Sequence, residues 1–170
     1  MITLVPYDKD WPILFKQEQQ LLANATSEYH VWIEHIGSTA IPEIHAKPII
    51  DIMLGVDSLD IADKHLLAPI QALGYMYLRE LEQQMPYRRF FQKIDIHGTR
   101  THHIHLVQYN SEFWIRHIRF RDHLRLNPNI AKKYEQFKLS LAPHFTDTRK
   151  YAEAKSDFIK TIENQAFISS

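Results

Sequence analysis

Hydrophobic residues in the first two thirds of the chain switch between helical and strand-like spacing. After the helix-start residues Asp10 and Pro12, apolar residues recur every three or four positions and predict a helix over 11–27. A second helix is expected over 58–73, ended by Gly74. Alternating or continuously apolar runs between turn residues predict strands at 29–36, 48–56, 75–78, 88–95 and 101–108.

The last third of the chain has a helical pattern throughout. Ser111 is suited to cap a helix, on which Asp122 and Arg125 are expected to form an ion pair, and the Asn-Pro-Asn sequence at 127–129 ends that helix. Three apolar stripes at helical spacing contain Phe113, His117, Phe120 and Leu124, then Ala131, Tyr134, Phe137 and Leu141, then Tyr151, Ala154, Phe158 and Ile162. No linker or repeat divides the chain, so we predict a single α+β domain over residues 1–170 with a helical C-terminal third.

Composition narrows the class of protein. The 170 residues include 20 basic and 20 acidic side chains, so no net charge attracts the chain to nucleic acid or to a membrane surface. The chain has no cysteine, which excludes disulfides and thiolate zinc sites. The N-terminal sequence lacks the features of a signal peptide, and no apolar run approaches the roughly 18 residues that span a bilayer. We therefore expect a cytoplasmic protein with no membrane partner and no strong signal for nucleic-acid binding.

The strongest local signal for chemistry is the sequence HIGST at residues 35–39. A strand that ends in Gly37 and Ser38 exposes backbone N–H groups that can bind phosphate oxygens, and glycine lets a ligand approach closely. Thr39 adds a second hydroxyl. The same residues could also form an ordinary turn with a capping hydroxyl, and the pattern alone does not separate the two interpretations.

Asp51 lies within the apolar strand predicted at 48–56. A lone carboxylate is costly to bury unless it is paired or bound to a metal ion. On the strand that follows the Gly37 turn, it could hold a divalent cation against a bound phosphate. The alternative is a buried ion pair with Lys47 or with an arginine. We favour the functional interpretation.

The segment HIGSTAIPEIHAKPIIDI, residues 35–52, closely resembles the signature of the GrpB family, which is placed in the nucleotidyltransferase superfamily. Other segments that agree with the family are Tyr7 with Trp11-Pro12, Arg89-Phe90-Phe91, His103-Ile104-His105, the sequence FRDHLR at 120–125, and Tyr151, Lys155 and Phe158. The resemblance covers nearly the whole chain and implies a mixed β-sheet backed by helices. Related domains are also found fused to dephospho-CoA kinases, which implies a role in nucleotide or cofactor metabolism.

The superfamily resemblance implies a Gly-Ser turn that binds a triphosphate and a strand bearing Asp-x-Asp that binds two Mg²⁺ ions. Gly37 and Ser38 match the turn, and Asp51 matches the first acid. The second acid position falls at Met53, which cannot bind Mg²⁺ and which shares a strand face with Asp51. The implied cofactors are a nucleoside triphosphate and a divalent metal (Mg, Mn or Zn), with one acid missing from the metal site.

His103 and His105 share a strand face because they are two residues apart. They could bind a transition metal, contact phosphate, or serve as acid and base, and they could equally be surface or hydrogen-bonded histidines. We predict that they join Asp51 in one metal-linked cluster and partly replace the acid missing at residue 53. A mixed carboxylate and imidazole site suits Mn²⁺, Zn²⁺ or Ni²⁺ better than Mg²⁺.

Three basic residues are candidates for binding the phosphates. Lys47 lies at the edge of the predicted site, and Arg89 and Lys93 share one face of the strand at 88–95. Solvated charges on that strand are the alternative. We predict that Ser38, Lys47 and at least one of Arg89 and Lys93 converge on one pocket.

Three functions follow from these residues. The first is nucleotidyl transfer from a nucleoside triphosphate to an unidentified small-molecule acceptor, with Asp51, His103 and His105 as the catalytic residues. The second is a nucleotide-binding module that has lost catalysis together with its second acid. The third is a histidine-assisted metal phosphohydrolase.

Overall fold

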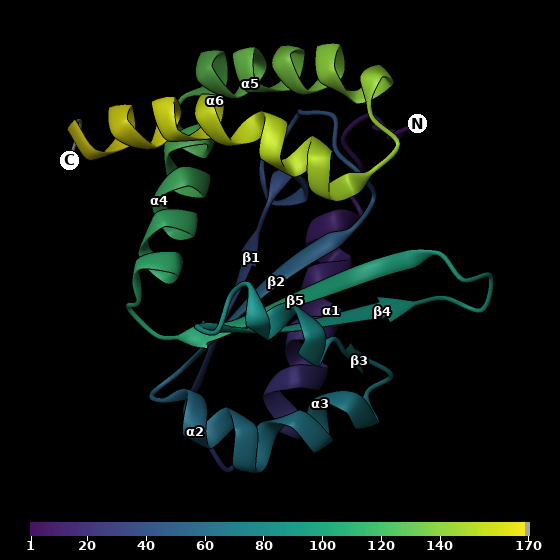
Figure 1. Ribbon diagram of the computed structural model, residues 1–170, viewed down its shortest axis with the longest axis vertical. Helices are drawn as coiled ribbons and strands as arrows, with labels where there is room; N and C mark the ends of the chain where they lie inside the picture. The colour runs from purple at the N-terminus through teal and green to yellow at the C-terminus, as the bar shows by residue number, and fades with distance from the viewer. Residues whose placement is uncertain (169–170) are drawn as a thin grey trace.

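The computed structural model describes residues 1–168 and has a five-stranded sheet at its centre (Figure 1). The strands are β1 Val31–Ile36, β2 Ile50–Val56, β3 Met76–Tyr77, β4 Arg88–Ile94 and β5 Arg100–Gln108. The α-helices are α1 Trp11–Ala25, α2 Leu59–Ile61, α3 Leu67–Ala72, α4 Glu112–Leu126, α5 Pro128–Leu141 and α6 Thr148–Ile168. Shorter helical turns are η1 Ser38–Ala40, η2 Ala62–Leu66, η3 Arg79–Gln83 and η4 Ala142–His144.

The predicted fold class is confirmed. Each predicted strand is present, with ends that differ from the prediction by one or two residues, and the C-terminal third is helical. The helix expected over 58–73 is made of α2, the π-helical turn η2 and α3 in succession. The sheet is mixed, with the order β1-β2-β5-β4-β3: β2 and β5 run parallel, and the other neighbours run antiparallel.

The strand register brings the sequence-predicted residues together. Ile36, the last residue of β1, lies opposite Asp51 in β2, and Asp51 lies opposite His103 in β5. The Gly37 turn therefore begins beside Asp51, as the sequence predicts. Parallel pairing between β2 and β5 also places Met53 opposite His105, on the same face of the sheet.

The two faces of the sheet are covered by different helices. One face of β2 consists of Ile50, Ile52, Leu54 and Val56, all buried in a core shared with α1, η2 and α3. On the other face Asp51, Met53 and Gly55 point toward the C-terminal helices. A Cβ atom on Gly55 would lie 2.7 Å from the ring of Trp114, so the glycine lets α4 pack directly on the sheet.

Two arginines fix α4 to the first strand and its turn. The Arg121 guanidinium donates to the Glu34 carboxylate at 2.5 Å and to the His35 carbonyl at 3.0 Å. Arg125 donates through Nε to the carbonyl of Ala40 at 2.8 Å. These bonds give the carbonyl groups of His35 and Ala40 a hydrogen-bond donor, and they hold α4 against β1 and η1.

The ion pair expected between Asp122 and Arg125 is wrong. Asp122 accepts from the neighbouring Arg121 at 2.8 Å, and Arg125 turns toward the η1 carbonyl instead. A buried carbonyl without a partner costs more than an exposed i,i+3 pair contributes, and it therefore determines the rotamer of Arg125.

The C-terminal helices also have an apolar core of their own. Leu124, Ala131, Tyr134 and Ile162 pack together, and Ile41 and Ile44 of the loop before β2 join them. This core connects α4, α5 and α6 to the segment that follows the Gly37 turn. Among residues 1–168, no helix combines the length and apolarity needed to cross a bilayer.

Candidate functional site

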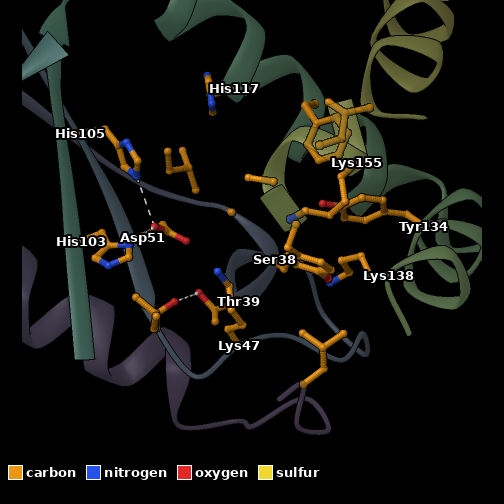
Figure 2. Close-up of a pocket in the computed structure, with 18 of the residues that line it drawn as sticks. Ser38, Thr39, Lys47, Asp51, His103, His105, His117, Tyr134, Lys138 and Lys155 are labelled. Carbon is orange, nitrogen blue, oxygen red and sulfur yellow. Dashed lines mark hydrogen bonds and ion pairs between the residues drawn. The ribbon is translucent and has the colours of Figure 1, made fainter. Parts of the chain in front are cut away.

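A cavity of about 350 Å³ lies between the sheet and the C-terminal helices (Figure 2). The sheet and the segment between β1 and β2 contribute Gly37, Ser38, Thr39, Lys47, Asp51, His103 and His105, and the helices contribute His117, Tyr134, Lys138, Tyr151 and Lys155. Seven of the nine site residues predicted from the sequence therefore line one cavity. The exceptions are Arg89 and Lys93.

Asp51 and two histidines form a compact cluster on the sheet side of the cavity. Asp51 Oδ1 lies 3.3 Å from His103 Nδ1 and 3.3 Å from His105 Nε2. The three side chains can offer ligand atoms that all lie within 4.8 Å of one another. Figure 2 shows both imidazole rings beside the Asp51 carboxylate. The predicted grouping is present, and binding of a metal ion to it stays a prediction.

The charge state of this cluster follows from its surroundings. Burial raises the pKa of Asp51, but hydrogen bonds and charge from His103 and His105 outweigh burial and hold the pKa well below its usual range. Burial lowers the pKa of His105 more than the Asp51 carboxylate raises it. At neutral pH the carboxylate is therefore ionised and the His105 ring is neutral, which are the forms that bind a metal ion.

Arg88 determines which ring nitrogen of His105 carries the proton. Its Nη1 lies 3.2 Å from His105 Nδ1, and a guanidinium can only donate. Nδ1 must therefore accept, which places the proton of the neutral ring on Nε2, where it is donated to Asp51. In this arrangement Asp51 and His103 are available to a metal ion, but Nε2 of His105 carries a proton and is not. His105 becomes a ligand only when Arg88 no longer donates to Nδ1, because the ring proton can then move to Nδ1.

Gly37 packs directly against the Asp51 carboxylate. Its φ is +73°, a backbone conformation that L side chains rarely adopt, and a Cβ atom would lie 2.6 Å from Asp51 Oδ2. Both observations require glycine at this position. The adjacent Ser38 hydrogen-bonds the Tyr134 hydroxyl, which connects the turn to α5. Thr39 also lines the cavity, but its hydroxyl donates to the Ile49 carbonyl and contacts His35 Nε2.

Three lysines reach the cavity from three separate segments. Lys47 precedes β2, Lys138 lies on α5 and Lys155 lies on α6. Burial lowers the pKa of Lys138 to about 7, with a further decrease from the charges of Lys155 and Lys47. Burial also lowers the pKa of Lys155 to about 8, and the Asp51 charge offsets part of this decrease. The pKa of Lys47 is lowered as well, first by burial and then by Lys155.

The prediction that Arg89 or Lys93 joins the phosphate pocket is wrong. Phe90 lies opposite His105 in the register, so Arg89 and Lys93 point to the other face of the sheet. There Arg89 donates to both oxygens of Asp63, at 2.7 and 2.9 Å, and Lys93 pairs with Glu18.

The residues that sequence analysis missed come from the helices and from the other strand face. Arg88 is on the His105 face, and the alternation along β4 would have selected it over Arg89 had the register been known. Lys138 and Lys155 each follow a tyrosine of an apolar stripe by four residues, Tyr134 and Tyr151 respectively. A lysine within a helical stripe of residues that otherwise face the core could have identified both as candidate site residues.

Met53, at the second acid position of the superfamily motif, is fully buried. It packs with Ile36, Val107 and Trp114 in an apolar cluster beneath α4. The position beside Asp51 is therefore part of the packing, and it provides no oxygen ligand for a second metal ion.

The family follows from comparison with known proteins. The sequence profile described as "GrpB protein" matches residues 1–165. The chain is 37% identical over 167 residues to the "Glutamate-rich protein GrpB" of Alkalihalophilus pseudofirmus, covering 96% of this chain and 95% of that protein. The crystal structure of the conserved protein GrpB from Enterococcus faecalis superimposes with a TM-score of 0.85 at 37% identity, covering 98% of each chain. This chain belongs to the GrpB family.

A shorter similarity connects the chain to a larger enzyme. A segment is 40% identical over 83 residues to the dephospho-CoA kinase of Mycobacterium tuberculosis, covering 47% of this chain and 20% of that protein. The similarity therefore concerns part of this chain and a minor part of the kinase.

Proposed function

We propose that the cavity binds a nucleoside triphosphate together with one divalent metal ion, and that it transfers the nucleotidyl group to a small-molecule acceptor. The observation that carries the proposal is the convergence, in one cavity of about 350 Å³, of the Gly37 turn, the Asp51 cluster and three lysines. A metal-binding side and a cationic side face each other, which matches a ligand whose charge lies in its phosphates.

The metal ion fits the residues on the sheet side. Asp51 supplies an ionised oxygen, His103 supplies a nitrogen, and His105 can supply a second nitrogen once Arg88 releases it. This donor set favours Mn²⁺ or Zn²⁺ over Mg²⁺. Because Met53 cannot bind a metal ion, the proposal involves one ion where the superfamily motif implies two.

In this proposal the Gly37 turn contributes to phosphate binding. The Gly37 turn, which admits no side chain beside Asp51, lets a phosphate approach the carboxylate closely. A bound metal ion would polarise the phosphoryl oxygens and neutralise developing charge. In the transfer itself, the oxygen of an acceptor hydroxyl attacks the α-phosphorus and its proton is released to water, while the bond between the α-phosphorus and the bridging oxygen breaks and pyrophosphate leaves.

A second candidate function is a nucleotide-binding module without catalysis. The burial of Met53 in an apolar cluster favours it, since the chain has packed a hydrophobic side chain where a second acid would act.

The experiment that tests the proposal uses the four nucleoside triphosphates labelled at the α-phosphate, with Mn²⁺, Zn²⁺ or Mg²⁺ and a small-molecule extract as the source of acceptor. We expect pyrophosphate and an equal amount of α-labelled product, both lost in Asp51→Asn. Binding without turnover would support the non-catalytic module. Release of inorganic phosphate with no labelled product would indicate a phosphohydrolase, and absence of nucleotide binding would contradict all three functions.

A further inference from the structure

Lys47, Lys138 and Lys155 line one cavity, and none forms an ion pair with any carboxylate of residues 1–168. Their contacts are aromatic faces and one carbonyl: Lys138 donates to the His45 carbonyl at 2.5 Å and lies 4.9 Å from the Tyr134 ring centroid. Glu163, the acid of α6 that lines the same cavity, pairs with Arg116 instead. Lys138 is buried, and Lys47 and Lys155 are partly buried. Ammonium groups withdrawn from water without an acid are costly, and a ligand of opposite charge would supply the partner.

Tyr151 provides a second, independent observation at the same place. Its ring lies 4.5 Å from Lys155 Nζ and 5.8 Å from Lys47 Nζ, so one aromatic ring supports two of the three cations. Its hydroxyl is buried and has no hydrogen-bond partner within residues 1–168. Burial raises the pKa of this phenol, which keeps it neutral and able to donate. An oxygen-rich anion would satisfy the hydroxyl and the lysines together.

The number of positive charges indicates the class of anion. A single phosphate group carries about two negative charges at neutral pH, which leaves one of three ammonium groups unmatched. A diphosphate or triphosphate carries enough charge and enough oxygens to engage all three lysines and the phenol at once. Linked phosphates therefore fit this side of the cavity better than a monophosphate does.

We propose that Lys47, Lys138 and Lys155 bind the linked phosphates of the nucleotide directly, in the place of the second divalent cation that Met53 cannot hold. The inference rests on the proposed function for the identity of the ligand as a nucleotide. It also predicts something that the proposed function does not, namely that phosphate binding persists when no metal ion is present. Lys138 and Lys155 lie on helices across the cavity from the Asp51 cluster, and Lys47 precedes β2. None of the three belongs to the candidate metal ligands, so metal binding and phosphate binding are separable (Figure 2).

The lowered pKa values of two of these lysines agree with this role. Burial, with repulsion from Lys155 and Lys47, lowers the pKa of Lys138 to about 7, and burial lowers that of Lys155 to about 8. A bound polyphosphate raises both values and restores full charge.

The test is calorimetric titration of the full chain with tripolyphosphate, pyrophosphate and orthophosphate in EDTA. Wild type is expected to bind tripolyphosphate without metal, and to bind orthophosphate at least about 10-fold more weakly. Lys155→Met is expected to weaken tripolyphosphate binding by about 10- to 100-fold, the range for a charge-assisted hydrogen bond. Lys47→Met is expected to show a loss of the same order.

Lys160→Met is the matched control, because Lys160 lies on the same helix, outside the cavity, with its side chain 64% exposed. Lys160→Met is expected to change the affinity for tripolyphosphate by less than about twofold. An equal loss of affinity in Lys155→Met and Lys160→Met would mean that only the net charge of the protein matters, and would overturn the inference. Binding that disappears in EDTA and returns with Mn²⁺ would also overturn it, and would leave the proposed function standing. Lysine-dependent binding of tripolyphosphate without any nucleotidyl transfer would support the inference and contradict the proposed function.

Discussion

The two faces of the central sheet are made by alternate residues of the same strands, and they differ in what they bury. Toward α1 and α3, Ile52, Phe91 and Leu106 are fully buried in a continuous apolar core. Toward α4, α5 and α6, the same strands present Asp51 and His105 to a cavity whose opposite side contains lysines. One-residue alternation thus separates a face with an apolar core and ion-paired charges from a face whose lysines have no carboxylate partner among the described residues.

The comparison shows where the molecule holds groups that disfavour folding. Lysines with lowered pKa values and no carboxylate partner among the described residues occur on the cavity side, whereas Lys93, which points to the apolar side, is paired with Glu18. Residues that reduce stability persist when a function requires them. The distribution of unfavourable burial therefore indicates a ligand site independently of any sequence motif.

The largest expected effect is on the apolar face. Phe91→Ala should lower the free energy of unfolding by about 3–5 kcal/mol, because it removes a fully buried ring from the core. The adjacent Phe90 is the matched control: it points to the cavity face, where its ring lies 5.0 Å from that of His103, and it is only partly buried. Urea denaturation of both variants measures the difference, and equal losses would contradict the contrast between the faces.

The next effect is the pH dependence of stability caused by His35, which is buried beneath the Phe15 ring and lies 2.9 Å from the Thr39 hydroxyl. Burial lowers the pKa of His35 to about 4, below the unfolded value near 6.5. The folded state therefore favours the neutral ring, and stability is lost as pH falls from about 6.5 to 4. At pH 5 the loss from this residue should be about 1–2 kcal/mol.

Thermal unfolding between pH 7 and pH 4.5 measures this loss. His35→Gln, which can still donate to Thr39, should have a shallower dependence of unfolding temperature on pH than wild type. His105 and His117, whose pKa values burial also lowers, remain in both proteins and contribute to the residual slope. Identical slopes for the two proteins would show that His35 does not contribute.

An effect of similar size and opposite sign is expected on the cavity side. Lys155→Met should raise the free energy of unfolding at pH 7 by about 1–2 kcal/mol, since the folded state disfavours the ammonium form. The folded pKa, about 8, is below the unfolded value, so wild-type stability rises with pH up to about 10.5 and the gap to the variant closes there. Denaturation at pH 7 and pH 10 checks both statements. A destabilised variant would mean that the lysine is a packing residue.

The smallest effect concerns Arg88 and the metal ion. Arg88→Gln should raise affinity for Mn²⁺ or Zn²⁺ by about 10-fold, because the glutamine oxygen can accept from His105 Nδ1 and leave Nε2 free for the ion. Arg88→Met, which removes the donor without supplying an acceptor, should show a smaller increase. Calorimetry with each metal separates the two variants. Weaker metal binding in Arg88→Gln would show that His105 is not a ligand.

Much of the fold and of the sheet side of the cavity could be predicted from the sequence. The continuous apolar run around Asp51 indicated a buried strand, and the spacing of His103 and His105 placed both rings on one face. Their meeting with Asp51 was predicted as well, and it is confirmed by the parallel register of β2 and β5.

The helix side could not be predicted, because the approach of α5 and α6 to the sheet depends on tertiary contacts. Lys138 is placed by its bond to the His45 carbonyl, while His45 itself is held by Glu135 of the same helix. Arg89 was chosen over Arg88 because sequence spacing shows which residues share a strand face but not which face meets the cavity.

The central claim is that one cavity binds a metal ion at Asp51 and linked phosphates at the three lysines. A crystal structure with a non-hydrolysable nucleoside triphosphate and Mn²⁺, with anomalous scattering to locate the metal, tests it most directly. The account predicts an anomalous peak within bonding distance of Asp51 and His103, and phosphate oxygens hydrogen-bonded to Lys47, Lys138 and Lys155. A nucleotide bound outside the cavity, or a metal ion bound away from Asp51, would contradict it.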